Sequence, residues 1–196
     1  MKKPLLIAAI LVLVSITLGA ASFIFFADIG ASKPASEYGG EFTLQSADGP
    51  VSLSDFEGKL VVIYFGFLSC TEACPESMGK INSVFRRLSD EQKAQLQVLF
   101  ISVDPERDSL ANLTKFADYY ENGPVIGLTD NQAVIDQISE QYNVLFDLVD
   151  LEGSALGYTV DHTSQFYLID QQGKLIKTMS HTTTANELRA QIEQLL

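Results

Sequence analysis

The sequence predicts an α/β domain in which helices cover a central mixed β-sheet. The apolar run Leu60–Phe65 has the composition of a strand that is buried on both faces. Apolar residues then recur at spacings of three and four from Met78 to Leu88, which is the pattern of an amphipathic helix. A second β-rich run follows at Val98–Val103. Strand, helix and strand in this order predict a parallel βαβ unit, with Leu60–Phe65 as the central strand of the sheet.

Short elements are expected on either side of this unit. A hairpin is predicted before it, because Phe42–Leu44 and Val51–Leu53 flank the turn signal Asp48-Gly49. After it, a helix is expected over 109–120, and Gly127-Leu128 is expected to enter a loop. The next helix is predicted to begin at a capping-box pattern formed by Thr129 and Gln132, and it carries Val134, Ile135, Ile138 and Tyr142 on one face.

The last third of the chain predicts antiparallel strands and a final helix. Leu145–Val149 is a candidate strand, followed by an irregular segment rich in Asp and Gly. Gln165–Ile169 and Leu175–Met179 predict an antiparallel hairpin, and the segment Thr184–Glu187 has a capping-box pattern ahead of a last helix. A parallel unit first, with a hairpin and a helix last, is the element order of a thioredoxin-like fold.

The N-terminus predicts a membrane anchor. The run Pro4–Ala27 contains no charged residue or histidine, and its 24 residues are long enough to span a bilayer as a helix. Lys2 and Lys3 precede it, so the positive-inside rule places the remainder of the chain on the exported, periplasmic side of the inner (cytoplasmic) membrane. The alternative is a cleavable signal peptide ending near Gly19–Ala21, but the apolar run continues past that site.

We therefore expect a single-pass anchor at residues 1–28, a Pro/Gly-punctuated linker at 29–40 and one domain at 41–196. The formal net charge is −12, and without the two N-terminal lysines 11 basic residues remain against 25 acidic ones, a net −14. Nucleic-acid binding needs clustered Lys and Arg, which are absent from this sequence. An acidic surface could instead suit a cationic partner, although a solvated surface is the simpler reading.

Cys70 and Cys74 are the only cysteines, and they are the strongest candidates for chemistry. They lie between the predicted central strand and the predicted helix, at the strand end where open α/β folds place their sites. A helix N-terminus also favours thiolate over thiol. Two close thiols can bind a soft metal or form a disulfide. A purely structural disulfide is the simplest alternative, but a bridge that closes so short a loop would constrain the unfolded chain little.

His162 is the expected third member of the site. We expect it in the loop before the strand Gln165–Ile169, which in a thioredoxin-like fold lies against the cysteine loop. Two sulfurs and one nitrogen in an open site suit Cu(I) and, with reorganisation, Cu(II). Zinc fits less well, because a closed structural site takes four ligands. The alternative for His162 is an ordinary histidine without a ligand role, and no role is expected for His181, which lies in a polar run before the last helix.

Several separated motifs resemble the Sco/SenC proteins, which are membrane-anchored, copper-binding proteins of thioredoxin fold that help to assemble cytochrome c oxidase. The resemblance covers about Phe42–Leu196. Its motifs are Cys70-x-x-x-Cys74-Pro75, Ile101–Asp108, Gly127–Thr129, Tyr158-x-Val-Asp-His162 and Tyr167–Asp170. By this resemblance Cys70, Cys74 and His162 are the copper ligands.

The chain departs from the family pattern in two places that bear on the site. Cys-Thr-Glu-Ala-Cys-Pro stands where members usually have Cys-Pro-Asp-Val-Cys-Pro, so Thr71 and Glu72 differ while both cysteines remain, and the preceding Phe67-Leu-Ser69 is unlike the usual Tyr-Thr-Phe. No proline precedes Gln165, which separates the chain from thioredoxins themselves, because these keep a cis-proline there. The loop Asp104–Asp108 reads as a surface ion-pair loop around Arg107, with contact to a partner as the alternative.

The resemblance implies a metallochaperone that holds one copper ion with two thiolates and one imidazole. Its implied partner is the copper-site subunit of cytochrome c oxidase or another copper chaperone. The alternative is a membrane-anchored thiol-disulfide oxidoreductase in which Cys70 and Cys74 are the redox pair and reduce the cysteines of a copper-site client or respond to oxidative stress. An exported domain with a structural disulfide is the third possibility.

Overall fold

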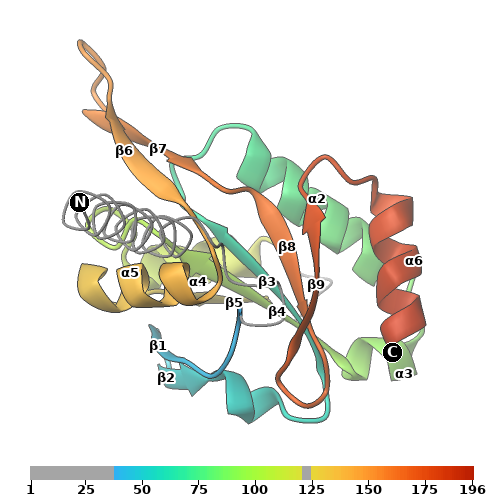
Figure 1. Ribbon diagram of the computed structural model, residues 1–196. Helices are drawn as coiled ribbons and strands as arrows, with labels where there is room; N and C mark the ends of the chain where they lie inside the picture. Colours follow the sequence, from blue (N-terminus) through green and yellow to red (C-terminus); the bar gives the residue numbers. More distant parts are fainter. Residues whose placement is uncertain (1–37, 121–124) are drawn as a thin grey trace, which may run out of the picture. The chain divides into compact units, whose positions relative to one another are not determined.

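A five-stranded mixed sheet forms the centre of the domain in the computed structural model, which describes residues 38–120 and 125–196 (Figure 1). The strand order is β5-β4-β3-β8-β9. Strands β3 (Leu60–Gly66), β4 (Leu96–Ser102) and β5 (Val125–Leu128) are parallel to one another. Strands β8 (Gln165–Ile169) and β9 (Leu175–Ser180) continue the sheet in antiparallel pairing. The predicted mixed sheet and its central strand are therefore confirmed.

Two apolar layers enclose this sheet. All seven residues of β3 are buried, and they alternate between the layers as β geometry requires. One layer contains buried residues of three helices: α2 (Ala73–Phe85), α4 (Leu110–Asp118) and α6 (Ala185–Leu195). The other layer contains buried residues of α5 (Gln132–Gln141) and of the hairpin formed by β1 (Thr43–Ser46) and β2 (Gly49–Ser52). Two short helices lie between these elements: η2 (Leu53–Phe56) and α3 (Asp90–Ala94).

The expected loop at Gly127-Leu128 is wrong, because both residues belong to β5, which pairs with β4 in parallel. Gly127 is paired with Phe100 and lies under α4. A Cβ at this position would approach Leu113 atoms to 2.8 Å, so a glycine is needed for the helix to pack this close to the strand. The glycine that suggested a loop instead marks a close approach of two elements.

The segment Tyr158–His162 was expected as a loop, and this is also wrong. It forms β7, which pairs with β6 (Phe146–Asp150) as a separate two-stranded antiparallel ribbon. Figure 1 shows this ribbon extending beyond the central sheet. The predicted strand Leu145–Val149 is confirmed with a shift of one residue. His162, the last residue of β7, is thus held in a hydrogen-bonded strand.

Helix starts follow local capping chemistry. The capping box expected at Thr184 and Glu187 is confirmed, with the Glu187 amide donating to Thr184 Oγ1 at 3.3 Å. The one expected at Thr129 is wrong, because Asn131 is the N-cap of α5 and accepts from the Val134 amide at 3.3 Å. Thr129 Oγ1 donates instead to the carbonyl of Ser102, at 3.2 Å, and so links the ends of β5 and β4.

Over 38–120 and 125–196, none of the helices combines the length and apolar character needed to cross a membrane. The predicted anchor at residues 1–28 lies outside the described residues, as does most of the predicted linker. Its last residues are described and contact α5: the Gly39 amide donates to the Gln141 carbonyl at 2.8 Å, and the Tyr142 hydroxyl donates to the Gly40 carbonyl at 2.7 Å.

Candidate metal centre

Two cysteines and a histidine that lies 88 positions after the second of them meet at the carboxyl end of β3. Cys70 lies in the loop that follows β3, and Cys74 is the second residue of α2. Strand β8 runs antiparallel to β3, with Ile63 paired to Tyr167, so the chain that enters β8 lies beside the end of β3. His162 is three residues before β8, and this pairing brings it to the cysteines. Ligand atoms of Cys70, Cys74 and His162 all lie within 4.8 Å of one another.

Cys74 is the buried member of the group, with an exposed fraction of 1%. Its Sγ lies 3.8 Å from His162 Nε2. The sulfur packs over Gly66, the last residue of β3, where a Cβ would approach it to 2.8 Å. Gly66 therefore leaves the space that the sulfur occupies. Gly66 was not among the predicted site residues, although a glycine that ends a buried strand commonly marks a close approach.

Cys70 is half-buried, and its sulfur caps helix α2. Glu72, the N-cap residue, makes no side-chain capping bond, and the Cys74 amide donates to Cys70 Sγ at 3.3 Å instead. Hydrogen bonding from the Cys74 thiol is the main cause that lowers the pKa of Cys70, to about 4. Hydrogen bonding to Cys70 is likewise the main cause that raises the pKa of Cys74, and burial raises it further. The reduced pair therefore holds one thiolate, on Cys70, and one thiol, on Cys74.

The imidazole of His162 is held between aromatic rings. It lies edge-on to Phe67 and Tyr64, with ring centroids 5.7 and 6.4 Å away. Nε2 faces Cys74 Sγ and also lies 3.5 Å from Ser164 Oγ. Nδ1 is buried and has no hydrogen-bond partner among the described residues. Neutral imidazole offers one lone pair, so the ring can supply a nitrogen ligand beside the two sulfurs.

Cys70 and His162 line an open hollow of about 430 Å³, and the sulfur of the buried Cys74 lies within 4.8 Å of their ligand atoms. Thr71 and Glu72 lie on its wall next to Cys70, and Leu151 and Leu156 reach it from the ribbon. Among the described residues, no fourth His, Cys, Asp or Glu side chain joins the group. An ion held here would have two soft sulfur donors, one nitrogen donor and an open side, which fits Cu(I) better than a closed zinc site.

The loop Asp104–Asp108 is not the surface ion-pair loop that was expected. Asp104 and Asp108 are each only 2% exposed. The predicted ion pair exists, with Arg107 Nε 2.6 Å from Asp104 Oδ2, but it is largely removed from solvent. Burial is the main cause that raises the pKa of Asp108. Buried carboxylates need partners, and two of the partners here, the Leu68 amide and the Tyr158 hydroxyl, belong to the segments that carry the candidate ligands.

His181 lies outside the group formed by Cys70, Cys74 and His162. Its Nδ1 is 3.2 Å from the carbonyl oxygen of Ser164, and its own carbonyl accepts a hydrogen bond from Lys80 at 2.5 Å. These contacts tie the start of β8 to helix α2 behind the site.

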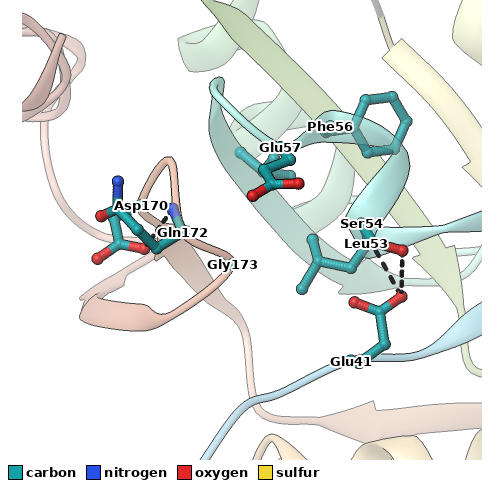
Figure 2. A pocket seen from close by; sticks show the side chains of 9 residues that line it. Glu41, Leu53, Ser54, Phe56, Glu57, Asp170, Gln172 and Gly173 are labelled. Carbon is teal, nitrogen blue, oxygen red and sulfur yellow. Dashed lines mark hydrogen bonds between the residues drawn. The ribbon is translucent and has the colours of Figure 1, made fainter.

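A second hollow, of about 220 Å³, lies at the opposite end of β3 (Figure 2). Two of its carboxylates already have local partners: Glu41 accepts from the amide and hydroxyl of Ser54, and Asp170 accepts from the amides of Gln172 and Lys174. It contains neither cysteine nor histidine. The chemistry of this domain is therefore concentrated at the carboxyl end of the strand.

The difference in pKa between the two thiols gives a first testable prediction. In the reduced, metal-free protein, iodoacetamide is expected to modify Cys70 and leave Cys74 unmodified. Because the pKa of Cys70 is about 4, the rate at which iodoacetamide modifies Cys70 should change less than about twofold between pH 8 and pH 6. A thiol with the ordinary pKa of about 8.5 would slow by about 75-fold over that range. Peptide mass spectrometry measures both sites, and the urea-unfolded protein is the control in which both should behave ordinarily. Equal labelling in the native state would contradict this assignment.

A thioredoxin-like sheet with two sulfur donors and one nitrogen donor at the end of its central strand defines a thioredoxin-fold protein with a candidate site for a soft metal ion. The chain belongs to the SCO1/SenC family, whose model matches residues 30–196. The resemblance stated from the sequence motifs is thereby confirmed.

Individual relatives agree with this assignment. The SCO2-like protein of Rickettsia felis is 34% identical over 140 residues, which are 71% of this chain and 67% of the relative. The copper-bound structure of ScoI from Bradyrhizobium japonicum is 30% identical, with a TM-score of 0.71 over 81% of this chain and 99% of that one. Copper-bound yeast Sco1 is 29% identical, with a TM-score of 0.70 over 81% and 87% of the two chains. These structures confirm the thioredoxin-like fold.

BsSco, described as having a disulfide switch and as a member of the Sco family of cytochrome c oxidase assembly proteins, shares the fold. It is 24% identical, with a TM-score of 0.61 over 84% of this chain and 96% of its own.

Proposed function

We propose that this protein is a copper-binding metallochaperone that acts in the assembly of the copper centre of cytochrome c oxidase. The observation that carries the proposal is the meeting of Cys70, Cys74 and His162, whose ligand atoms lie within 4.8 Å of one another, two of them on the wall of an open hollow. Membership of the SCO1/SenC family and the copper bound to two relatives of similar fold support it. The cargo is one copper ion held by two thiolates and one imidazole.

The chemistry of the pair suits capture and release. Cys70 is already a thiolate, so only the Cys74 proton has to leave when copper binds. The half-exposed Cys70 and the open side of the hollow leave room for a ligand from a partner, and exchange of ligands one at a time would move the ion without exposing it to water. Oxidation of the two thiols to a disulfide would remove both sulfur donors, so binding should require the reduced protein.

The proposed location follows from the N-terminal sequence. The uncharged run Pro4–Ala27 behind Lys2 and Lys3 supports a single-pass anchor at residues 1–28 in the inner membrane. With a linker at 29–40, the domain at 41–196 would face the exported side, where we propose that it meets the copper-site subunit of the oxidase or another copper chaperone.

Transfer of copper to a client tests the proposed function directly. The full chain, reduced and loaded with one equivalent of Cu(I), is mixed anaerobically with the metal-free copper-site domain of the oxidase subunit from the same organism. After separation, we expect copper in the recipient, and we expect none when the donor is the Cys70→Ser/Cys74→Ser double variant treated in the same way. If the loaded wild-type protein keeps its copper in the presence of this recipient, delivery to the oxidase is wrong.

A thiol-disulfide oxidoreductase is the second candidate, and the unequal thiols favour it. The Cys70 thiolate would attack a client disulfide and form a mixed disulfide, and one client sulfur would leave as a thiolate. Cys74, after losing its proton, would then attack Cys70, releasing the second client thiolate. The client is reduced by two electrons, and Cys70 and Cys74 end as a disulfide. A Cys74→Ser variant should trap the mixed disulfide with an oxidised client domain through Cys70. Failure to trap it with the oxidised copper-site domain would argue against this activity.

A further inference from the structure

The loop Asp104–Asp108, between β4 and α4, contacts both chain segments that carry the candidate ligands. It supplies no ligand itself, because the ligand group among the described residues consists of Cys70, Cys74 and His162. Its contacts instead divide into two arms. One arm reaches the backbone ahead of Cys70, and the other reaches the beginning of the strand that ends at His162. The loop therefore lies where it can set the distance between the two halves of the site.

The first arm belongs to Asp108. Its Oδ2 accepts the backbone amide of Leu68 at 2.9 Å and the hydroxyl of Ser102 at 2.6 Å. Leu68 is two residues before Cys70, so this bond fixes the start of the cysteine loop to the end of β4. A carboxylate that is 98% removed from solvent and accepts two hydrogen bonds is a rigid anchor, because losing either bond would leave a buried polar group without a partner.

The second arm belongs to Arg107. Its Nε donates to Asp104 Oδ2 at 2.6 Å, and its Nη1 donates to the carbonyl oxygens of Tyr158, at 2.7 Å, and Leu156, at 3.3 Å. The guanidinium carbon also lies 3.6 Å from the centre of the Tyr158 ring. The Tyr158 hydroxyl binds the other oxygen of the same carboxylate, donating to Asp104 Oδ1 at 2.8 Å. Both the backbone and the ring of Tyr158 are thus bound to this loop.

The strand that carries His162 needs such support. Tyr158 and His162 are the first and last residues of β7, which among the described strands pairs with β6 and forms no ladder with the central sheet. All residues of β6 except Phe146 are exposed, and Val160 is the one fully buried residue of β7, so the ribbon contributes few side chains to the apolar core. A two-stranded ribbon is marginally stable by itself in water. The contacts of Arg107 and Asp104 supply a fixed point at the end of β7 opposite to the histidine.

We propose that Arg107 is a positioning residue of the metal centre: by joining the backbone of β7 to the buried Asp104, it holds His162 at the distance at which its ring can share an ion with Cys70 and Cys74. The inference rests on the proposed copper site. Arginine suits this task because its planar fork donates in two directions at once, to a carboxylate and to two carbonyls. A lysine would keep the charge, but its single ammonium group would not reproduce the fork.

A double-mutant cycle on the full chain tests the proposal, with Cu(I) affinity measured by anaerobic competition against a chelator. Arg107→Gln is expected to weaken Cu(I) binding by about 10-fold or more, the range found when a partner that orients a ligand is lost. In the His162→Ala background, the same change should weaken binding by less than about twofold, because the effect acts through the imidazole. A loss of similar size in both backgrounds would mean a general structural role and would overturn the proposal.

Three further measurements sharpen the test. Amide hydrogen exchange of metal-free Arg107→Gln should become faster in 158–162 and stay unchanged in β3. Arg107→Lys should bind copper no better than Arg107→Gln, and recovery of affinity by lysine would assign the effect to charge and contradict positioning. Arg87→Gln is the matched control, since Arg87 also donates through Nη1, to Asn186 at 2.8 Å, but is exposed and lies in the turn after α2, beyond the helix end opposite to the site. It should bind copper as the wild type does.

The outcomes distinguish a failure of the positioning role of Arg107 from a failure of the proposed copper site. If the wild type binds copper, His162→Ala binds it weakly and Arg107→Gln binds it normally, the positioning role is wrong and the proposed site stands. If His162→Ala binds as tightly as the wild type, the proposed ligand set is wrong and the positioning role falls with it. If Arg107→Gln does not fold, Tyr158→Phe replaces it in the cycle. This variant keeps the ring under the guanidinium and loses only the bond to Asp104. The proposal then requires Tyr158→Phe to lower Cu(I) affinity by at least about threefold, and to have no such effect in the His162→Ala background.

Discussion

Replacing Cys74 by serine is expected to weaken Cu(I) binding by more than about 100-fold, beyond the range found for the loss of a residue that only orients a ligand. The change replaces a soft sulfur donor by a hard oxygen donor in a position that is 1% exposed, where neither water nor another side chain can take its place. Cys70→Ser should have an effect of similar size, because it removes the thiolate. His162→Ala should have a smaller but clear effect, because both sulfurs remain.

The measurement is an anaerobic Cu(I) competition titration of each reduced full-length variant. His181→Ala is the matched control, since it removes the other histidine of the chain, whose Nδ1 faces the carbonyl of Ser164 and not the sulfurs. It should bind copper within about twofold of the wild type, well under the 10-fold effect of losing an orienting partner. Unchanged affinity in both cysteine variants would refute the proposed ligand set.

Gly66→Ala is expected to damage both the fold and the metal centre. The added Cβ would lie 2.8 Å from Cys74 Sγ and 2.9 and 3.0 Å from two ring carbons of Phe100, in a fully buried part of the sheet. Overpacking of this kind costs about 1–3 kcal/mol in the free energy of unfolding. Movement of the sulfur to relieve this contact would also change its 3.8 Å distance to His162 Nε2, so copper affinity should fall together with stability.

Urea unfolding and the copper titration together measure these two effects. Gly79→Ala is the control, because Gly79 is an exposed glycine of α2 and a Cβ there would meet no atom within 4 Å. Alanine favours a helix over glycine by about 0.5–1 kcal/mol, so this variant should be more stable than the wild type and bind copper normally. A Gly66→Ala protein with wild-type stability and affinity would show that the space over the glycine is not needed.

The sequence was sufficient to predict the parts of the fold whose apolar residues are continuous or repeat at a regular spacing. Strand β3 is apolar throughout, and α2 has apolar residues at helical spacing, so both could be predicted together with the position of Cys70 between them. Strands β6 and β7 could not be recognised as a pair, because most of β6 is exposed on both faces and shows no alternation. The role of Gly127 was misread because a glycine that allows close packing has the same signature as one that ends a strand.

The meeting of the ligands could be predicted from the fold type, but their supports could not. Burial of Asp104 depends on Tyr158, which lies 54 positions further along the chain, and an Asp-Pro-Glu-Arg-Asp sequence has the local composition of a surface loop. The role of Gly66 likewise depends on where α2 places the sulfur of Cys74. Both features arise from tertiary contacts between segments that carry no signal of each other in the sequence.

The capping of α2 by Cys70 fixes the number of residues between the two cysteines but not their side chains. The sulfur that would bind copper also accepts an amide of the first helical turn, that of Cys74, so the three intervening residues form a loop that lets one sulfur do both. Thr71 and Glu72 are exposed, and neither provides the cap. Their side chains are therefore free to differ from those of other family members, whereas an inserted or deleted residue would uncap the helix and dismantle the ligand pair in a single step.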